Sequence, residues 1–207
     1  MGEIESYFAT RVYRVELGGG VRGRLRIAEI ERACRSLAAD DTAGQHWCDM
    51  NRYPGYTSYA SLDDLPTRFP EFASLVPLLD EHVAAFARAL EYDLGHKRMT
   101  LDSLWVNVLP PGGYHTSHIH PNAAISGTCY VAVPKGASAL KLEDPRLPLM
   151  MAAPPRKASA SRSGRSFVSI EPKAGTVLLW ESFVRHEVPV NEAPGERISV
   201  SFNYRWG

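Results

Sequence analysis

The spacing of apolar and polar residues changes near residue 100, which divides the chain into two halves. Over residues 8–16 apolar and polar residues roughly alternate, and this predicts a strand. Residues 26–38 carry apolar side chains at helical spacing, and so does a longer run over 70–93, with Gly95 as a stop signal. The intervening residues 44–68 are rich in Gly, Pro, Tyr and Ser and predict an ordered loop. The N-terminal half should therefore hold one strand and two helices.

Short apolar runs recur from Leu101 onward, each bounded by Gly, Pro or Asn. Such runs are typical of an all-β sandwich or barrel and not of βαβ units. Residues 145–166 interrupt them with five basic residues and no acid, and we predict a mobile loop that could meet an anionic group on a substrate. The predicted strands cover residues 104–109, 125–133, 139–142, 167–170, 176–180 and 197–204.

Length and charge narrow the class of protein. A chain of 207 residues suits a single domain over 1–207, in which 1–100 supports a core and site in 101–207. Its 23 basic residues balance 23 acidic ones, which argues against a general nucleic-acid or membrane-surface binder. The longest apolar stretches fall short of a membrane span, and the start does not resemble a signal peptide, so the cytoplasm is the expected compartment. Three cysteines at irregular spacing do not suggest a disulfide framework or a zinc site.

Four histidines have the spacing of a metal site. His118 and His120 are two residues apart, so on a strand both side chains face the same way. His186 would join them from a distant strand, and three imidazoles on one side leave the other side of a metal open. On a regular strand, the side chain of His115 would face the opposite way from those of His118 and His120. Alternatively, His115 would lie in the turn after Gly112 and Gly113. Imidazole suits Fe, Zn, Cu and Ni alike, and a surface cluster of histidines is the alternative to any metal site.

Arg197 lies 11 residues after His186, and an antiparallel hairpin of that length can place its guanidinium beside the metal. A buried Arg requires an anionic partner, because an unpaired buried charge costs several kcal/mol. Its planar fork suits a carboxylate. Ser199 lies on the same strand face and can donate its hydroxyl to that carboxylate. The hairpin therefore predicts a carboxylate site next to the metal.

A late His followed by an Arg-x-Ser strand, after an earlier His pair, resembles the 2-oxoglutarate/Fe(II)-dependent oxygenase superfamily. The resemblance implies an α+β fold that is mainly β, a double-stranded β-helix (jelly roll) with N-terminal helices packed on it. It also implies Fe(II), 2-oxoglutarate and molecular oxygen as reactants, with Tyr130 helping Arg197 and Ser199 to hold the distal carboxylate. The chain looks most like a small branch of that superfamily at Tyr53 to Tyr59, Asn107, Gly113, His118-x-His120-Pro121, Ser126-Gly127, Tyr130, Asp144-Pro145-Arg146, Gly175 and His186 to Asn203.

His120 departs from the family pattern, in which two His and one carboxylate usually bind the iron. We expect His118, His120 and His186 to be the ligands. Two alternatives remain: Asp144 could supply a carboxylate, or His115 could replace one of the first pair. No catalytic side chain is expected beyond the metal centre.

The expected reaction is a hydroxylase-type oxidation of an unidentified substrate, coupled to decarboxylation of 2-oxoglutarate to succinate. One rival keeps the fold but is a cupin-like three-His dioxygenase that does not use 2-oxoglutarate; the Arg197-x-Ser199 pair argues against it. A second rival is a non-enzymatic jelly roll that binds a ligand or protein, which would leave the aligned histidines unexplained.

Overall fold

Two antiparallel sheets form the body of the protein in the computed structural model, which describes residues 2–146 and 149–207. The larger sheet has six strands in the order β1-β8-β5-β10-β3-β2, and the smaller has four in the order β4-β9-β6-β7. The strands are β1 (Val12–Glu16), β2 (Tyr56–Thr57), β3 (Met99–Leu109), β4 (His115–His118), β5 (Ile125–Ala132), β6 (Leu140–Glu143), β7 (Phe167–Ile170), β8 (Thr176–Glu181), β9 (His186–Val188) and β10 (Arg197–Trp206).

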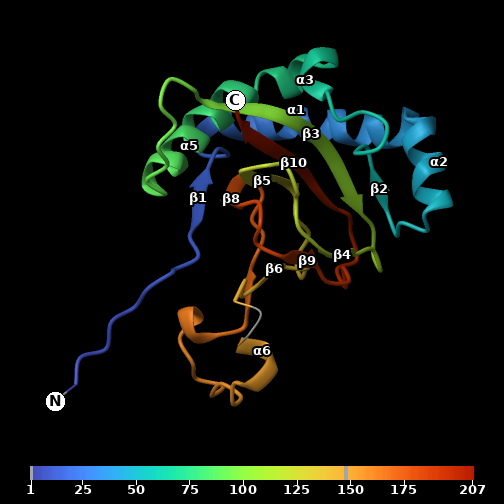
Figure 1. Ribbon diagram of the computed structural model, residues 1–207. Helices are drawn as coiled ribbons and strands as arrows, with labels where there is room; N and C mark the ends of the chain where they lie inside the picture. The colour runs from blue at the N-terminus through green and yellow to red at the C-terminus, as the bar shows by residue number, and fades with distance from the viewer. Residues whose placement is uncertain (1, 147–148) are drawn as a thin grey trace.

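Helices α1 to α5 lie along one face of the larger sheet, the smaller sheet lies below its other face, and α6 lies apart from them, beyond the smaller sheet (Figure 1). The helices are α1 (Gly20–Asp40), α2 (Thr42–Met50), α3 (Leu65–Arg68), α4 (Pro70–Ala73), α5 (Val76–Ala89) and α6 (Leu149–Ala152), with a 3-10 turn at Arg162–Gly164. No helix in the described part of the chain is long and apolar enough to cross a membrane.

The central strands are buried on both faces, which explains their nearly continuous apolar sequences. In β5, Cys129 and Val131 pack into the cluster under the helices, whereas Tyr130 between them belongs to a second cluster between the sheets. The alternation of side chains along a strand thus sends neighbouring residues into two different cores. At one end, the apolar cluster between the two sheets borders polar side chains, and there it forms one wall of the candidate site described below.

Most elements of the prediction are present, with shifted boundaries. The strand predicted over 8–16 is β1, the helix predicted over 26–38 extends to 20–40 as α1, and the six predicted runs of the C-terminal half correspond to strands. All three cysteines are free and buried.

The loop predicted over 44–68 is wrong in part, because it contains α2, β2 and α3. Asp41 lies between α1 and α2, and its side chain caps α2 by accepting a hydrogen bond of 3.0 Å from the backbone N–H of Gly44.

The helix predicted over 70–93 is also interrupted, between α4 and α5. Pro77 has no N–H, and in a continuous helix its ring would clash with the carbonyl of Ala73. It is tolerated only in the first turn of a new helix, where it lies.

The predicted loop over 145–166 contains two short helical turns, α6 and the turn at Arg162–Gly164. Its residues 147 and 148 lie outside the described part of the chain. Its mobility stays a prediction.

Candidate metal and cosubstrate site

Three histidines converge at one end of the smaller sheet, two from its strands and one from the turn after β4. His118 ends β4 and His186 begins β9, and the two are partners in the antiparallel pairing. Nε2 of His120 lies 3.2 Å from Nε2 of His186. One ring nitrogen from each of the three histidines lies within 4.8 Å of the other two. This spacing suits one metal ion, because Zn or Fe binds imidazole nitrogen at about 2.0–2.1 Å.

His120 reaches the cluster by a different route from the predicted one. Strand β4 ends at His118, so His120 is presented by the following turn and not by the strand face. Its backbone N–H donates to the carbonyl of Ser182 in the turn between β8 and β9, at 3.1 Å. The carbonyl of Val184 in that turn accepts a hydrogen bond of 2.9 Å from Nδ1 of His186. One turn therefore supports two of the three histidines.

Hydrogen bonds select the tautomer of two histidines. Nδ1 of His118 lies 2.7 Å from the carbonyl of Thr116, and Nδ1 of His186 bonds in the same way to Val184. A carbonyl only accepts, so Nδ1 carries the hydrogen in both rings and Nε2 keeps a free lone pair. Burial, with a smaller contribution from neighbouring histidines, lowers the pKa of His120 to about 4 and that of His186 to about 3. The rings are therefore neutral at pH 7, as a metal ligand must be.

Arg197 begins β10 and is 2% exposed. Its Nε donates to the carbonyl of Ser138 at 3.1 Å, and its guanidinium carbon lies 5.1 Å from the centre of the Tyr130 ring. No Asp or Glu of the described chain forms an ion pair with it. Burial lowers its pKa from the ordinary value, yet an arginine remains charged. The fold therefore buries the positive charge of Arg197 without pairing it with a carboxylate of the described chain.

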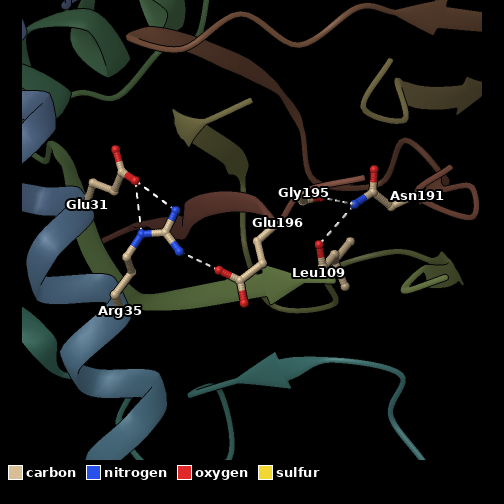
Figure 2. Close-up of polar contacts among 6 residues, drawn as sticks. All are labelled: Glu31, Arg35, Leu109, Asn191, Gly195 and Glu196. Carbon is tan, nitrogen blue, oxygen red and sulfur yellow. Dashed lines mark hydrogen bonds and ion pairs between the residues drawn. The ribbon is translucent and has the colours of Figure 1, made fainter. Parts of the chain in front are cut away.

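The loop that leads into Arg197 is held at both ends (Figure 2). The amide of Asn191 donates to the carbonyls of Leu109 and Gly195, at 3.1 and 2.9 Å. Glu196 pairs with Arg35 of α1, which also bonds to Glu31. The exposed ion pairs add little stability, but the buried amide of Asn191 fixes the path of the chain just before β10.

A cavity of about 50 Å³ connects the histidines with Arg197. Ser199 and Ser201 face it from the same side of β10, and Asn107 faces it from β3. Nδ2 of Asn107 donates to Ser201 at 3.1 Å, while its buried Oδ1 has no partner among the described residues. The cavity is lined by Tyr53, Trp105, Asn107, Leu109, His115, His118, His120, Gly127, Thr128, Leu140, Trp180, His186, Val188, Arg197, Ser199 and Ser201.

Two residues singled out in the sequence lie elsewhere than expected. Tyr130 is fully buried and supports Arg197 with its ring face, but it does not line the cavity. His115 faces the cavity, because the pairing of β4 with β9 is irregular between His115 and His118. A regular strand would have turned it away, so that expectation is corrected by the bulge.

The alternative carboxylate, Asp144, lies outside the histidine cluster. Its two oxygens bind Arg146, at 2.9 and 2.7 Å, in a turn after β6. It belongs neither to the group of convergent ligand atoms nor to the lining of the cavity.

Tyr53 and Trp105 also line the cavity, and neither was among the predicted site residues. The ring of Trp105 lies 5.8 Å from that of His120, and the alternation along β3 could have indicated that Trp105 and Asn107 face the same way. Tyr53 follows a helix in the N-terminal half, and no local pattern could have placed it here.

Comparison with known proteins assigns the C-terminal half to a family. The model of a family described as "Putative 2OG-Fe(II) oxygenase" matches residues 103–203. A search of curated protein sequences finds no match.

Several solved structures share the fold over 95% of this chain. A prolyl-4-hydroxylase from Pseudomonas putida is 15% identical, is covered over 93% of its length and has a TM-score of 0.62. The epimerase SnoN from nogalamycin biosynthesis, in complex with Fe3+, alpha ketoglutarate and nogalamycin RO, is 15% identical, with 79% of its length covered and a TM-score of 0.64. HygX from Streptomyces hygroscopicus, with nickel and 2-oxoglutarate bound, is 15% identical, with 82% covered and a TM-score of 0.60.

The family match spans β3 to β10, which carry the histidine cluster and Arg197, and the donor set of the cavity suits a metal and a dicarboxylate. Over residues 103–203 the chain is similar to the family of putative 2-oxoglutarate- and Fe(II)-dependent oxygenases.

Proposed function

We propose that this enzyme holds Fe(II) with Nε2 of His118, His120 and His186 at the mouth of a double-stranded β-helix. The two antiparallel sheets, with an apolar cluster between them, support this more detailed description of the fold. We also propose that residues 1–207 are one domain, since β1 pairs with β8 and β2 pairs with β3 across the two halves of the chain.

Three neutral imidazoles supply the proposed metal site. The convergence of the ring nitrogens within 4.8 Å supports it, as does the tautomer of His118 and His186. Imidazole ligands leave the full charge of the Fe(II), in contrast to the usual two-His-one-carboxylate set. A dianionic cosubstrate would offset that charge, which favours its binding next to this particular ligand set.

Arg197 carries the proposal for the cosubstrate. It is a buried cation with no carboxylate partner in the described chain, at the inner end of the cavity that the histidines open. We propose that Arg197 and Ser199 bind the distal carboxylate of 2-oxoglutarate. Tyr130 contributes from beneath: its ring face supports the guanidinium, and its buried hydroxyl has no partner among the described residues.

When bound, iron and 2-oxoglutarate would supply the oxidising chemistry with molecular oxygen as the oxidant: one oxygen atom is taken up as 2-oxoglutarate loses CO₂ to give succinate, and the other hydroxylates a substrate. The side chains of this protein bind and orient these groups and keep water from the inner end of the cavity. No side chain beyond the metal centre is assigned a proton-transfer role. The substrate is not defined by the cavity.

The balanced charge of the chain supports a substrate other than nucleic acid or a membrane surface. The cytoplasm stays the expected compartment. An anionic group on the substrate would find basic residues over 145–166.

Anaerobic titration of the protein with Fe(II), with and without 2-oxoglutarate, tests the proposal. The weak visible charge-transfer absorption of the iron–2-oxoglutarate complex should develop only with both. A three-His dioxygenase that does not use 2-oxoglutarate would bind iron alone, and a binding module would bind neither.

Arg197→Ala should raise the 2-oxoglutarate dissociation constant about 30- to several-thousand-fold, because removing one partner of a buried charge pair costs about 2–5 kcal/mol. Arg197→Lys keeps the charge but loses the fork, so its effect should be smaller. Affinity for Fe(II) alone should barely change in either variant. Equal 2-oxoglutarate binding by wild type and Arg197→Ala would reject the assigned role.

A further inference from the structure

A tyrosine and a histidine form a hydrogen-bonded pair inside the cavity, apart from the three convergent histidines. Nδ1 of His115 lies 3.2 Å from the hydroxyl oxygen of Tyr53, and their ring centres lie 5.5 Å apart at 72°. Both residues line the cavity together with Arg197. The ring of His115 also meets that of His118 at 4.4 Å, so the pair lies between the histidine cluster and the buried cation.

The pair has one more donor than its own hydrogen bond uses. Tyr53 carries an O–H, and an imidazole carries at least one N–H. If the hydrogen of His115 is on Nδ1, it donates to Tyr53 and the phenol O–H is left. If it is on Nε2, the phenol donates to Nδ1 and the Nε2–H is left. In both cases one donor remains for a further acceptor.

The cavity itself supplies no anionic acceptor. None of the described residues that line it is Asp or Glu, while Arg197 and Ser199 add further donors at the same end. A carboxylate accepts several such hydrogen bonds at once and would neutralise the guanidinium.

The backbone around Tyr53 is built to hold it in this position. Arg52 has a φ of +53°, a left-handed conformation that is unfavourable for a residue with a side chain. A Cβ on Gly55 would lie 2.6 Å from a carbonyl oxygen of β3, and a Cβ on Gly113 would lie 2.6 Å from the carbonyl oxygen of Pro54. The chain therefore passes so close to β3 and the following turn that only glycine fits at these two positions.

We infer that His115 donates from Nδ1 to Tyr53, and that the O–H of Tyr53, brought in by the N-terminal half of the chain, is a further donor to the distal carboxylate of 2-oxoglutarate, beside Arg197. This inference rests on the proposed function. It adds Tyr53, which lies outside the matched segment 103–203, to the cosubstrate site. The pair would then favour the binding of dicarboxylic over monocarboxylic 2-oxo acids.

Tyr53→Phe tests the inference, because it removes only the hydroxyl. Under anaerobic conditions with Fe(II) bound, the variant should bind 2-oxoglutarate about 10- to 100-fold more weakly, as expected for a lost hydrogen bond to a charged group. Its affinity for 2-oxopentanoate, which has a methyl group in place of the distal carboxylate, should stay within about twofold of wild type, and so should its affinity for Fe(II) alone. The matched control is Tyr114→Phe, the same change at a half-exposed tyrosine that does not line the cavity.

A structural role for Tyr53 would give a different pattern. If Tyr53→Phe binds 2-oxoglutarate as wild type does, or loses affinity for 2-oxopentanoate or iron to the same extent, the inference is overturned while the proposed function stands. If wild type itself does not bind 2-oxoglutarate, the proposed function and the inference both fail.

Discussion

His120 differs from the two other histidines of the cluster in how it is held. His118 and His186 each bond through Nδ1 to a carbonyl two residues earlier in the chain. The only hydrogen bond found for the ring of His120 in the described chain joins its Nε2 to His186. Its position is set through its backbone, and its ring orientation by contact with Trp105. The proposal that His120 takes the place of the usual carboxylate ligand therefore depends on this one side chain.

Replacement of His120 and of Asp144 decides between the two ligand sets. His120→Ala should abolish stoichiometric Fe(II) binding, as His186→Ala should, with native far-UV CD spectra in both. Asp144→Asn should keep full iron content, because Asp144 is paired with Arg146 and lies outside the cluster. Metal analysis after desalting measures all three variants. Loss of iron in Asp144→Asn with retention in His120→Ala would restore a two-His-one-carboxylate site.

At the level of elements, the turn between β8 and β9 positions two ligands at once. The carbonyl of Ser182 accepts a hydrogen bond from the backbone N–H of His120. The buried hydroxyl of Ser182 lies 2.7 Å from the hydroxyl of Ser126 on β5. The hydroxyl of Ser126 in turn donates to Asn203 of β10 at 2.8 Å. The turn is thus anchored to two central strands of the larger sheet, although the ligands belong to the smaller one.

Ser182→Ala should loosen this anchor without touching a ligand side chain. We expect a loss of about 1 kcal/mol in the free energy of unfolding and an iron affinity lower by about 10-fold, the range seen when supporting hydrogen bonds of metal ligands are removed. Anaerobic iron titration and urea denaturation measure the two effects, with the exposed Ser161→Ala as control. Unchanged iron affinity would mean that the turn holds its shape without the hydroxyl pair.

At the scale of the whole molecule, burying several neutral histidines makes the metal-free fold sensitive to acid. Burial lowers the pKa of His115 to about 3, of His120 to about 4 and of His186 to about 3. The unfolded chain binds protons at these residues below a pKa of about 6.5, before the folded chain does, so acid favours unfolding.

The metal-free protein should therefore lose stability as the pH falls from about 6.5 to 5, by about 1 kcal/mol or more per pH unit. Urea denaturation at several pH values measures this slope. His115→Phe should make it shallower, because one proton-binding difference between the two states is removed. A pH-independent midpoint across this range would show that the histidines are accessible to protons in the folded state.

Much of the β architecture and of the metal cluster could be predicted from local sequence. Short apolar runs bounded by Gly, Pro or Asn mark the strands. The antiparallel hairpin expected from His186 to Arg197 is wrong, because β9 pairs with β4 and β6 in the smaller sheet, whereas β10 pairs with β3 and β5 in the larger one. His186 and Arg197 nevertheless line the same cavity, from two facing sheets. The helical half was harder: the loop predicted over 44–68 contains most of α2, which Asp41 caps, and the helix predicted over 70–93 is interrupted before Pro77, because a single residue can either end one helix or begin the next.

The sequence by itself determined which residue types could meet, and the tertiary structure decided which of them do. Periodicity is a local property, so it could assign Arg197 and Ser199 to one strand face. The irregular pairing that turns His115 inward and the turn that presents His120 depend on contacts with β9 and with Ser182, far away along the chain. Tyr53 enters the cavity only because its segment packs against β3, some 50 residues later in the sequence. Such contacts form only when the two halves of the chain fold together.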